Sequence, residues 1–420
     1  MKRTVWMLVS IVSAALAAGS ASAQGAKPAQ YSVTDLGTLG GTYSYSYSIN
    51  NAGAIAGGAA TPEQVDGFGQ TAFVWYHGRI ASLGTLGGPD CPMCNSENAT
   101  VSMAGTSVVL SETATPDPNG EDFCGFGTHR QCLAGVWMNG GLKALPTLSG
   151  GHNSQAYFIN KMGQAVGFSE TGVADANCAM PFQIFRFEGV KWDTNGVPQP
   201  LRPLPGDTVS FALGINDAGQ AVGVSGLCSN TTFPPNGPPS GPHAVVWDAN
   251  GNPTEIASLP GAAGNNVAST TNNLGDVAGN QAVSDGTNHG FLWSAETGLV
   301  DVMMPETFLT VIPCCHSINE SRQITGFAVN ENGPLGFVWQ NGTFTDLNTV
   351  LAAGSPWYIF NTASINSAGQ IAATGFNFNT GEAHAVLLSP LPANGAPLAR
   401  GAARMPALPA AILNQYGRRK

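Results

Sequence analysis

The chain has 420 residues, of which 54 are glycine and only 10% are charged, and its formal net charge is −10. Soluble domains usually carry about 25% charged residues. Such a composition favours short strands and tight turns over long helices. Nucleic-acid binding is not expected, because phosphate neutralisation needs clustered Lys and Arg, and no basic stripe is present.

Residues 1–23 have the features of a secretory signal peptide. Lys2 and Arg3 form the charged start, Val5 to Ala18 the apolar stretch, and Ala21-Ser22-Ala23 a small-residue cleavage site. The apolar stretch is shorter than the roughly 20 residues that a membrane span needs, and no later segment qualifies. We therefore predict an exported protein, periplasmic or extracellular, with no membrane span.

A repeat marked by Ile-Asn-x-x-Gly runs along the rest of the chain. Asn tolerates left-handed backbone angles and bonds its own backbone, and Gly adopts positive φ without steric cost, so the motif predicts a tight turn. Ser102 replaces the Asn in the second copy, and Arg322 replaces the Gly in the sixth. The Asn positions of the copies are 50, 102, 160, 216, 272, 319 and 366.

Each copy contains four predicted strands. Period-two alternation precedes and follows the Asn turn, and a third strand then ends on Trp, before a Gly-bearing hairpin turn and a fourth strand. The Trp residues are Trp75, Trp137, Trp192, Trp247, Trp293 and Trp339. Repeats of 40–55 residues with four strands are typical of β-propeller blades.

The ends of the chain favour a closed ring. Residues 31–41 resemble a fourth strand, whereas the seventh copy stops after its third strand, at Leu388. We therefore predict an all-β, seven-bladed β-propeller over residues 31–390, closed by the N-terminal strand completing the last blade. Residues 24–30 form a short lead, and the Ala- and Pro-rich tail 391–420 is expected to be disordered. An open β-solenoid is the alternative.

Three motifs resemble the HAF repeat family of bacterial extracellular proteins. They are Leu-Gly-Thr-Leu-Gly-Gly at 36–41 and 83–88, the Ile-Asn-x-x-Gly turns, and His-Ala-x-x-Trp at 243–247. The resemblance covers roughly residues 31–388 and implies an exported bacterial repeat protein. It implies no particular activity.

Strand connections should alternate between the two faces of the ring. The Asn turns and the hairpins after Trp share one face, and all of them are short. The loops between second and third strands share the other face with the fourth-to-first connections, and they vary in length, as binding loops do. Candidate binding sites are therefore expected on the face with the long loops.

The eight cysteines of an exported chain predict disulfides. We expect Cys91, Cys94, Cys124 and Cys132 to pair among themselves and Cys178 to pair with Cys228. Cys314 and Cys315 form either a vicinal bridge or two thiols. A four-thiolate zinc site is the alternative for the first four cysteines.

Other motifs have structural and functional interpretations. His243, His289 and His384 share one repeat position, which favours a recurring hydrogen bond. Asp117-x-Asn119-x-Glu121 loosely resembles a calcium loop but lacks the EF-hand spacing. Aromatic side chains could bind sugar rings or a peptide, or they could only pack. The candidate ligand-binding residues are Tyr43, Tyr45, His152, Trp357 and Tyr358.

The function we predict is binding of a glycan, peptide or surface protein by the long-loop face of a monomeric propeller. No catalytic set can be assembled from spacing, and no cofactor or metal is predicted. The alternatives are an extracellular hydrolase or lyase with its site in the central funnel of that face, and an adhesive scaffold. A convergent set of titratable residues near the axis would favour the enzyme, and a packed apolar funnel would disfavour it.

Overall fold

The computed structural model describes residues 29–63, 70–178, 182–232, 239–302 and 308–392. The predicted signal peptide, most of the predicted lead and nearly all of the predicted tail lie outside the described residues. Within those ranges the secondary structure is β-strand, apart from the short 3-10 turns η1 (Gly88–Asp90) and η2 (Leu347–Thr349). The described part of the chain contains no helix long and apolar enough to cross a membrane.

Hydrogen bonding sorts the strands into five four-stranded sheets and one eight-stranded sheet. The larger sheet consists of two four-strand sets joined by one parallel residue pair, Asn288 with Thr310. We call the four-stranded sets units 1 to 7 in chain order.

The strands of the first four units are as follows. Unit 1 contains β2 (Ser44–Ile49), β3 (Ile55–Ala59), β4 (Thr71–Tyr76) and β5 (Arg79–Ser82). Unit 2 contains β6 (Ser96–Val101), β7 (Ser107–Pro116), β8 (Arg130–Met138) and β9 (Gly141–Ala144). Unit 3 contains β10 (Ser154–Ile159), β11 (Ala165–Ala174), β12 (Phe185–Trp192) and β13 (Pro198–Leu201). Unit 4 contains β14 (Val209–Ile215), β15 (Ala221–Gly226), β16 (His243–Trp247) and β17 (Pro253–Glu255).

The remaining strands form units 5 to 7. Unit 5 contains β18 (Ala262–Thr271), β19 (Val277–Val283), β20 (Asn288–Ser294) and β21 (Gly298–Val302). Unit 6 contains β22 (Phe308–Ile318), β23 (Ile324–Asn330), β24 (Gly333–Gln340) and β25 (Thr343–Asp346). Unit 7 contains β26 (Trp357–Ile365), β27 (Ile371–Asn377), β28 (Glu382–Pro390) and the N-terminal strand β1 (Tyr31–Asp35).

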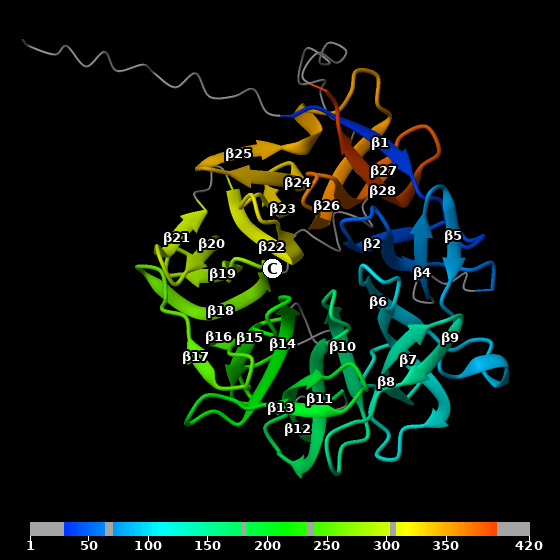
Figure 1. Cartoon of the computed structure of the whole chain (residues 1–420), viewed down its shortest axis with the longest axis vertical. Helices are drawn as coiled ribbons and strands as arrows, with labels where there is room; N and C mark the ends of the chain where they lie inside the picture. The colour runs from blue at the N-terminus through cyan, green and yellow to red at the C-terminus, as the bar shows by residue number, and fades with distance from the viewer. Residues whose placement is uncertain (1–28, 64–69, 179–181, 233–238, 303–307, 393–420) are drawn as a thin grey trace, which may run out of the picture.

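The units are arranged around a central axis, with first strands near the axis and fourth strands at the rim (Figure 1). Neighbouring units pack through buried Val, Ile, Ala, Phe and Trp side chains. Trp192 and Trp247 are fully buried, and each indole N–H donates to a backbone oxygen of the preceding unit, Pro146 or Arg202, at 2.8 Å. This radial packing of four-stranded sheets is that of a β-propeller.

The N-terminal strand completes the last unit. β1 pairs antiparallel with β28, from Tyr31 opposite Pro390 to Asp35 opposite Val386. In Figure 1 the two strands lie side by side although they come from opposite ends of the chain. The placement of this strand agrees with the prediction from the sequence.

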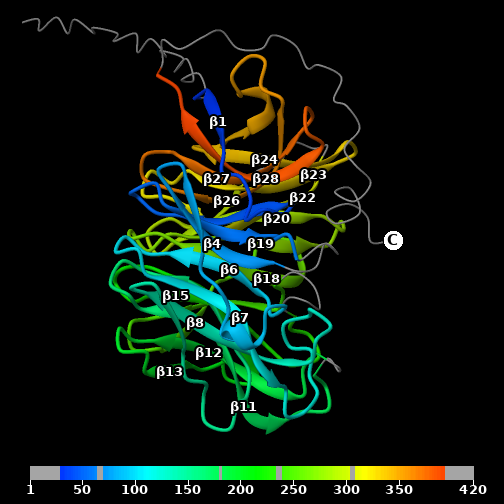
Figure 2. The same ribbon diagram turned by 90° about the vertical axis from the view of Figure 1, so that its right-hand side faces the viewer.

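Two faces follow from the strand order. We call the side with the Asn turns and the hairpins between third and fourth strands the turn face. The opposite side, with the second-to-third loops and the connections between units, is the loop face. Figure 2 shows the units from the side, with their connections at the two ends of the strands.

The Asn side chains bond each turn and then bridge to the next unit. Asn50 Oδ1 accepts from the N–H groups of Ala52 and Ala54, and its Nδ2 donates to Ser102 O at 2.9 Å. The same bridge runs from Asn160 to Asn216, Asn216 to Asn272, Asn272 to Asn319, Asn319 to Asn366, and Asn366 to Asn50, at 3.0–3.1 Å.

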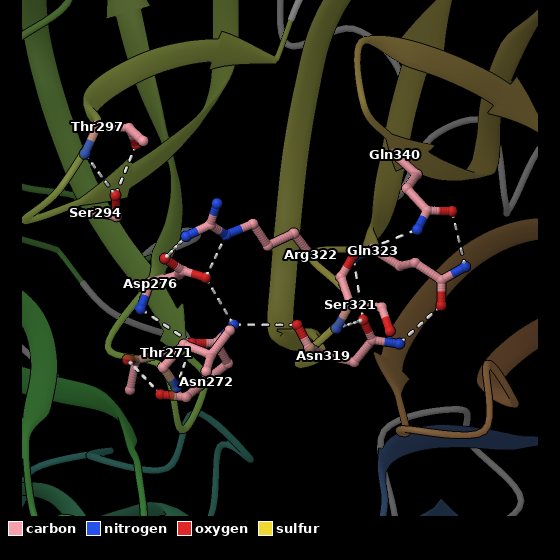
Figure 3. Close-up of polar contacts among 11 residues, drawn as sticks. Thr271, Asn272, Asp276, Ser294, Thr297, Asn319, Ser321, Arg322, Gln323 and Gln340 are labelled. Atoms are coloured by element: carbon pink, nitrogen blue, oxygen red, sulfur yellow. Dashed lines mark hydrogen bonds and ion pairs between the residues drawn. The ribbon is translucent and has the colours of Figure 1, made fainter.

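The two irregular copies keep the turn. Ser102 is too short to bridge, and its buried hydroxyl has no hydrogen-bond partner among the described residues. Arg322 adopts φ 55°, close to the angles of the glycines it replaces, and its N–H donates to Asn319 O at 3.0 Å. Its guanidinium bonds Asp276 of the preceding unit, as Figure 3 shows.

β-Bulges shape the first strands and fill the space near the axis. The register shifts beside Tyr47, Tyr157 and Leu213, in units 1, 3 and 4. A bulge leaves one residue out of the ladder and re-aims its side chain. Tyr157 and Leu213 belong to one apolar cluster with Val267 of unit 5, and Tyr47 packs against it. The cluster also contains residues of units 2 and 3, such as Leu110 and Phe168, so it runs continuously from unit 1 to unit 5.

Candidate functional site on the loop face

Three disulfides brace the loop face of units 2 to 4. Cys91 pairs with Cys94 before unit 2, and Cys124 pairs with Cys132 across the second-to-third loop of unit 2. Cys178 pairs with Cys228 and joins the corresponding loops of units 3 and 4, with Cα atoms 4.7 Å apart. The predicted pairing is confirmed for these six cysteines. Cys314 and Cys315 lie on β22, but their side chains are outside the described residues.

Acidic residues gather on the loop face. Arg130, Arg186 and Arg202 are the basic residues that the described part of the chain places in or beside these loops, and Lys143 lies one residue from the loop-face end of β9. The acidic residues in its loops, or at the adjoining strand ends, are Asp35, Glu63, Asp90, Glu97, Glu112, Asp117, Glu121, Asp122, Glu170, Asp175, Asp207, Glu255, Asp285, Asp301, Glu331, Asp346 and Glu382. The loop face is therefore strongly negative, whereas Arg79, Lys161, Lys191 and Arg322 largely balance the fewer acids of the turn face.

Two buried glutamates bond the start of a first strand. Glu112 Oε2 accepts from the backbone N–H of Asn95 at 2.7 Å and from its side-chain amide at 2.9 Å. In unit 3, Glu170 Oε2 accepts from Asn153 in the same way, at 2.9 Å and 3.2 Å. Each Asn then accepts from the preceding unit through its Oδ1. These contacts fix where two first strands begin on the loop face.

This pattern was missed in the sequence analysis. Asn-Ser at 95–96 and 153–154, with Ser-Glu at 111–112 and 169–170, recurs at the same spacing in copies two and three. A search for motifs shared by only two copies could have found it. The pairing of a second-strand Glu with a first-strand Asn across the sheet, however, needed the strand register.

The long second-to-third loop of unit 2 reaches over unit 3. Asp117 Oδ2 accepts from Asn153 Nδ2 at 2.8 Å, and a carboxylate oxygen of Glu121 accepts from the N–H of Ile184. Both carboxylates are buried. Burial, followed by the nearby Glu170, raises the pKa of Glu121 to about 8. Burial and Glu112 likewise raise the pKa of Glu97 to about 7.

The segment that loosely resembles a calcium loop is a hydrogen-bonded turn in the structure. Asp117 Oδ1 accepts from the N–H groups of Asn119 and Glu121 at 2.8 and 2.9 Å. Over the described ranges, no three Asp, Glu, His or Cys side chains form a group that could hold a metal ion. The carboxylate of Asp117 therefore stabilises the loop.

Three of the predicted aromatic residues lie on units 1 and 7 but face different neighbours. Tyr43 bridges to Ala383 of β28, and its ring lies 5.9 Å from that of Tyr45, whose hydroxyl accepts from the N–H of Asn98 in unit 2 at 3.4 Å. Trp357 packs against the core of units 6 and 7 and lies 6.1 Å from the ring of His384. All three aromatic side chains are half-buried. Of the three, Trp357 is placed beside the acidic residues Asp35 and Glu382, which both contact His384.

The other two predicted residues are placed differently. Tyr358 is 4% exposed and donates its hydroxyl to Pro334 O at 2.9 Å, within the core of units 6 and 7. Burial raises its pKa above the ordinary range. His152 lies in unit 3, where its N–H donates to Glu170 at 3.1 Å. The structure therefore does not bring the five candidate residues into one site.

The repeated histidines each contact a carboxylate on the neighbouring fourth strand. Nδ1 of His243 lies 2.8 Å from Glu255, that of His289 lies 2.9 Å from Asp301, and that of His384 lies 3.0 Å from Asp35. The recurring hydrogen bond expected from the repeat is confirmed. His384 also approaches Glu382, through Nε2 at 3.4 Å.

A cavity of about 200 Å³ opens at the axis on the turn face, away from the long loops. Its rim carries Asn51, Lys161, Asp217 and Glu320 from the turns of four units. Lys161 and Asp217 form an ion pair at 2.9 Å. Deeper along the axis lies the apolar cluster that contains Tyr157 and Leu213.

No protein-family profile and no curated protein matches this sequence. Solved structures with a similar fold include the β-propeller domain of the Trilobed protease from Pyrococcus furiosus, at 10% identity and a TM-score of 0.46, covering 84% of this chain and 100% of that one. An acylaminoacyl peptidase from Pyrococcus horikoshii has 10% identity and a TM-score of 0.46, covering 84% and 53%. A prolyl endopeptidase structure has 9% identity and a TM-score of 0.49, covering 86% and 50%. The chain spans about half the length of these two peptidases, and at such low similarity their activities do not transfer to it.

Proposed function

We propose that this protein is an exported, seven-bladed β-propeller that binds a cationic partner through its loop face. Each unit is taken as one blade, and the ring closes between units 7 and 1. The Asn366–Asn50 bridge at 3.1 Å and the pairing of β1 with β28 support closure. Membership of the HAF repeat family, export and a monomeric state are part of the same proposal, and the disulfides fit an oxidising compartment.

The observation that carries the binding function is the charge of the loop face. Twelve acidic residues of this face are exposed or half-buried, and five more are buried, namely Glu112, Asp117, Glu121, Asp122 and Glu170. The described part of the chain offers the face three arginines, with Lys143 near the end of β9. A surface of one sign attracts partners of the opposite sign and accelerates their association. A Lys- or Arg-rich polypeptide segment is therefore a better partner for this face than a neutral glycan.

A contact surface for such a segment lies on unit 7. Trp357 lies beside His384, which contacts Asp35 and Glu382, and we call Trp357, Asp35 and Glu382 the unit 7 patch. The side chains of Asp35 and Glu382 are 41% and 38% exposed, so they can reach a ligand. Aromatic faces attract ammonium and guanidinium groups, and each such contact contributes about 0.5–2 kcal/mol to binding. The unit 7 patch therefore offers both a ring face and carboxylates to a Lys or Arg side chain.

Binding of lysine-rich and glutamate-rich peptides of equal length to the intact protein tests this function. We expect only the lysine-rich peptide to bind, and its affinity to fall with added salt. Trp357→Ala should weaken binding by about three- to tenfold, which is the size of one cation–π contact. Tyr76→Ala is the matched control, because Tyr76 is 45% exposed but lies on the turn face.

Two outcomes would contradict the proposal. Equal binding of both peptides would remove the role of charge, and loss of binding in Tyr76→Ala with none in Trp357→Ala would place the site on the wrong face. A glycan array run on the same protein distinguishes glycan binding from binding of a cationic peptide, because the affinity for a neutral glycan would not depend on salt.

A further inference from the structure

The long loop of unit 2 has an unusual attachment to unit 3. Residues 117–129 connect β7 to β8, and two of their carboxylates are inserted between the units. Asp117 accepts from Asn153 Nδ2, and Glu121 accepts from the N–H of Ile184. The side chain of Glu121 is fully buried. The attachment therefore depends on acidic groups that have been removed from water.

Glu170 provides the neighbouring carboxylate, because Gln183 donates to Glu170 and the next residue, Ile184, donates to Glu121. The hydrogen bonds of Glu170 are already complete. Its Oε2 accepts from the N–H groups of His152 and Asn153 and from Asn153 Nδ2, and its Oε1 accepts from Gln183 Nε2 at 3.2 Å. A carboxylate that accepts several N–H groups is stabilised in its ionised form. Burial raises the pKa of Glu170 as well, but these N–H groups oppose that rise, so Glu170 is the member of the pair whose ionised form is better stabilised.

Glu121 lacks such donors at one oxygen. Its Oε1 bonds Ile184, but its Oε2 is buried and has no hydrogen-bond partner among the described residues. A buried acceptor without a donor is costly, and a buried like-charged pair is more costly still. A proton on Glu121 Oε2 relieves both problems, because it removes one charge and provides a donor toward Glu170.

We propose that Glu121 and Glu170 share one proton, and that this proton fastens the 117–129 loop of unit 2 onto unit 3. As the pH rises the proton passes to water, two buried anions face each other, and the loop separates from unit 3. The disulfide between Cys124 and Cys132 keeps the released loop attached at its distal end. The loop face therefore changes its shape with pH.

The surrounding charges strengthen the effect. Asp117 lies on the same loop and adds a further negative charge, and the pKa of Glu121 is raised first by burial and then by Glu170. On unit 3, Arg186 is engaged by Asp175 at 2.9 Å. Among the described contacts of Asp117, Glu121 and Glu170, none comes from a Lys or Arg side chain. Within the described residues no basic side chain is therefore in place to compensate a second charge.

Amide hydrogen exchange of the intact, oxidised protein at about pH 6 and about pH 9 tests the proposal. After correction for intrinsic exchange, protection of residues 117–129 should fall at least about tenfold at the higher pH. In Glu121→Gln the amide can donate to Glu170 and its oxygen can accept from Ile184, so protection should be retained at both pH values. Asp122→Asn is the matched control. The Asp122 carboxylate accepts only from Gly127, at 3.0 and 3.1 Å, so this variant should behave like the wild type.

Identical pH profiles for the wild type and Glu121→Gln would overturn the proposal. If Glu121→Gln does not fold, infrared spectroscopy of the wild type decides: the band of a protonated carboxyl group should be present at about pH 6 and lost by about pH 9. Absence of that band at the lower pH would refute the shared proton. The same exchange measurement with added calcium chloride tests for a cation site. If Ca²⁺ increases the protection of residues 117–129 in the wild type and not in Glu121→Gln, the carboxylates bind a cation instead of sharing a proton.

Discussion

Arg322 and Asp276 form a pair whose energetics can be worked out from the repeat. In copies three, four and seven a Gly follows the Asn by three residues and a Gln follows it by four. The side-chain oxygen of Gln220 lies 3.6 Å from where a Cβ on Gly275 of the next unit would stand, and Gln323 faces Gly369 at the same distance. In units 5 and 6 Asp276 replaces that Gln and Arg322 replaces that Gly. The two departures from the repeat therefore face each other.

We predict that Arg322→Gly destabilises the protein. Asp276 has a side-chain exposure of 1% and accepts the guanidinium at 2.8 and 3.0 Å. Removing one partner of a buried pair costs about 3–5 kcal/mol. The cost is lower here because the Arg322 side chain is 38% exposed. Glycine at this position also removes the strain of a left-handed backbone at a residue with a side chain, which is about 1 kcal/mol. A net loss of about 1–3 kcal/mol remains.

The double variant Arg322→Gly with Asp276→Gln restores the repeat and should recover this loss. Gln at position 276 can accept from Asn272 Nδ2, as Gln220 does from Asn216 at 2.9 Å. Urea unfolding of the single and double variants measures the difference. Lys161→Ala is the control, because its ion pair with Asp217 is exposed and should contribute less than about 1 kcal/mol. A single variant as stable as the wild type, or a double variant no better than Arg322→Gly, would refute the reasoning.

Three further predictions concern separate parts of the ring. Ser102→Asn supplies the missing bridge toward unit 3 and should raise the free energy of unfolding by about 0.5–1.5 kcal/mol; an unchanged urea midpoint would show that the bridge does not form. Replacing both Cys178 and Cys228 with Ser should cost about 2–4 kcal/mol, the usual contribution of a disulfide, and a reducing agent should then lower the unfolding midpoint of the variant less than that of the wild type. Glu97 has a folded pKa of about 7, above its ordinary value. The contribution of Glu97 to the free energy of unfolding is therefore fully present below the ordinary carboxyl range and is lost as the pH rises through about 7. Glu97→Gln should flatten the pH dependence of the thermal midpoint over that interval, and an unaltered profile would contradict the assignment.

The repeat made the strand order predictable, because each element rests on local chemistry. Asn and Gly specify the turn on positions such as 50 and 53, and period-two alternation specifies the strands beside it. The placement of β1 also followed from counting strands. The compensation of Arg322 by Asp276 did not, because the two residues lie 46 positions apart in the sequence and meet only through the packing of neighbouring units.

The candidate site was less predictable, for a related reason. Aromatic residues are visible in a sequence, but their burial is not, and adjacent Trp357 and Tyr358 point into different surroundings. Tyr358 enters the core, while Trp357 is half-exposed beside His384. The buried glutamates looked like ordinary loop acids. Only the register that places Glu170 beside Asn153, and the loop that brings Glu121 to the same place, distinguishes them from solvated residues.

The two faces vary differently because they carry different constraints. On the turn face each Asn side chain must reach a carbonyl of the next unit, so a change in turn length would break a bridge such as Asn216 to Asn272. The loops of the opposite face have no such common partner. They can lengthen, gain disulfides and collect acidic residues while the strands remain in place. The rigid turn face thus preserves the geometry of the ring, and the loop face can specialise for a cationic partner without disturbing it.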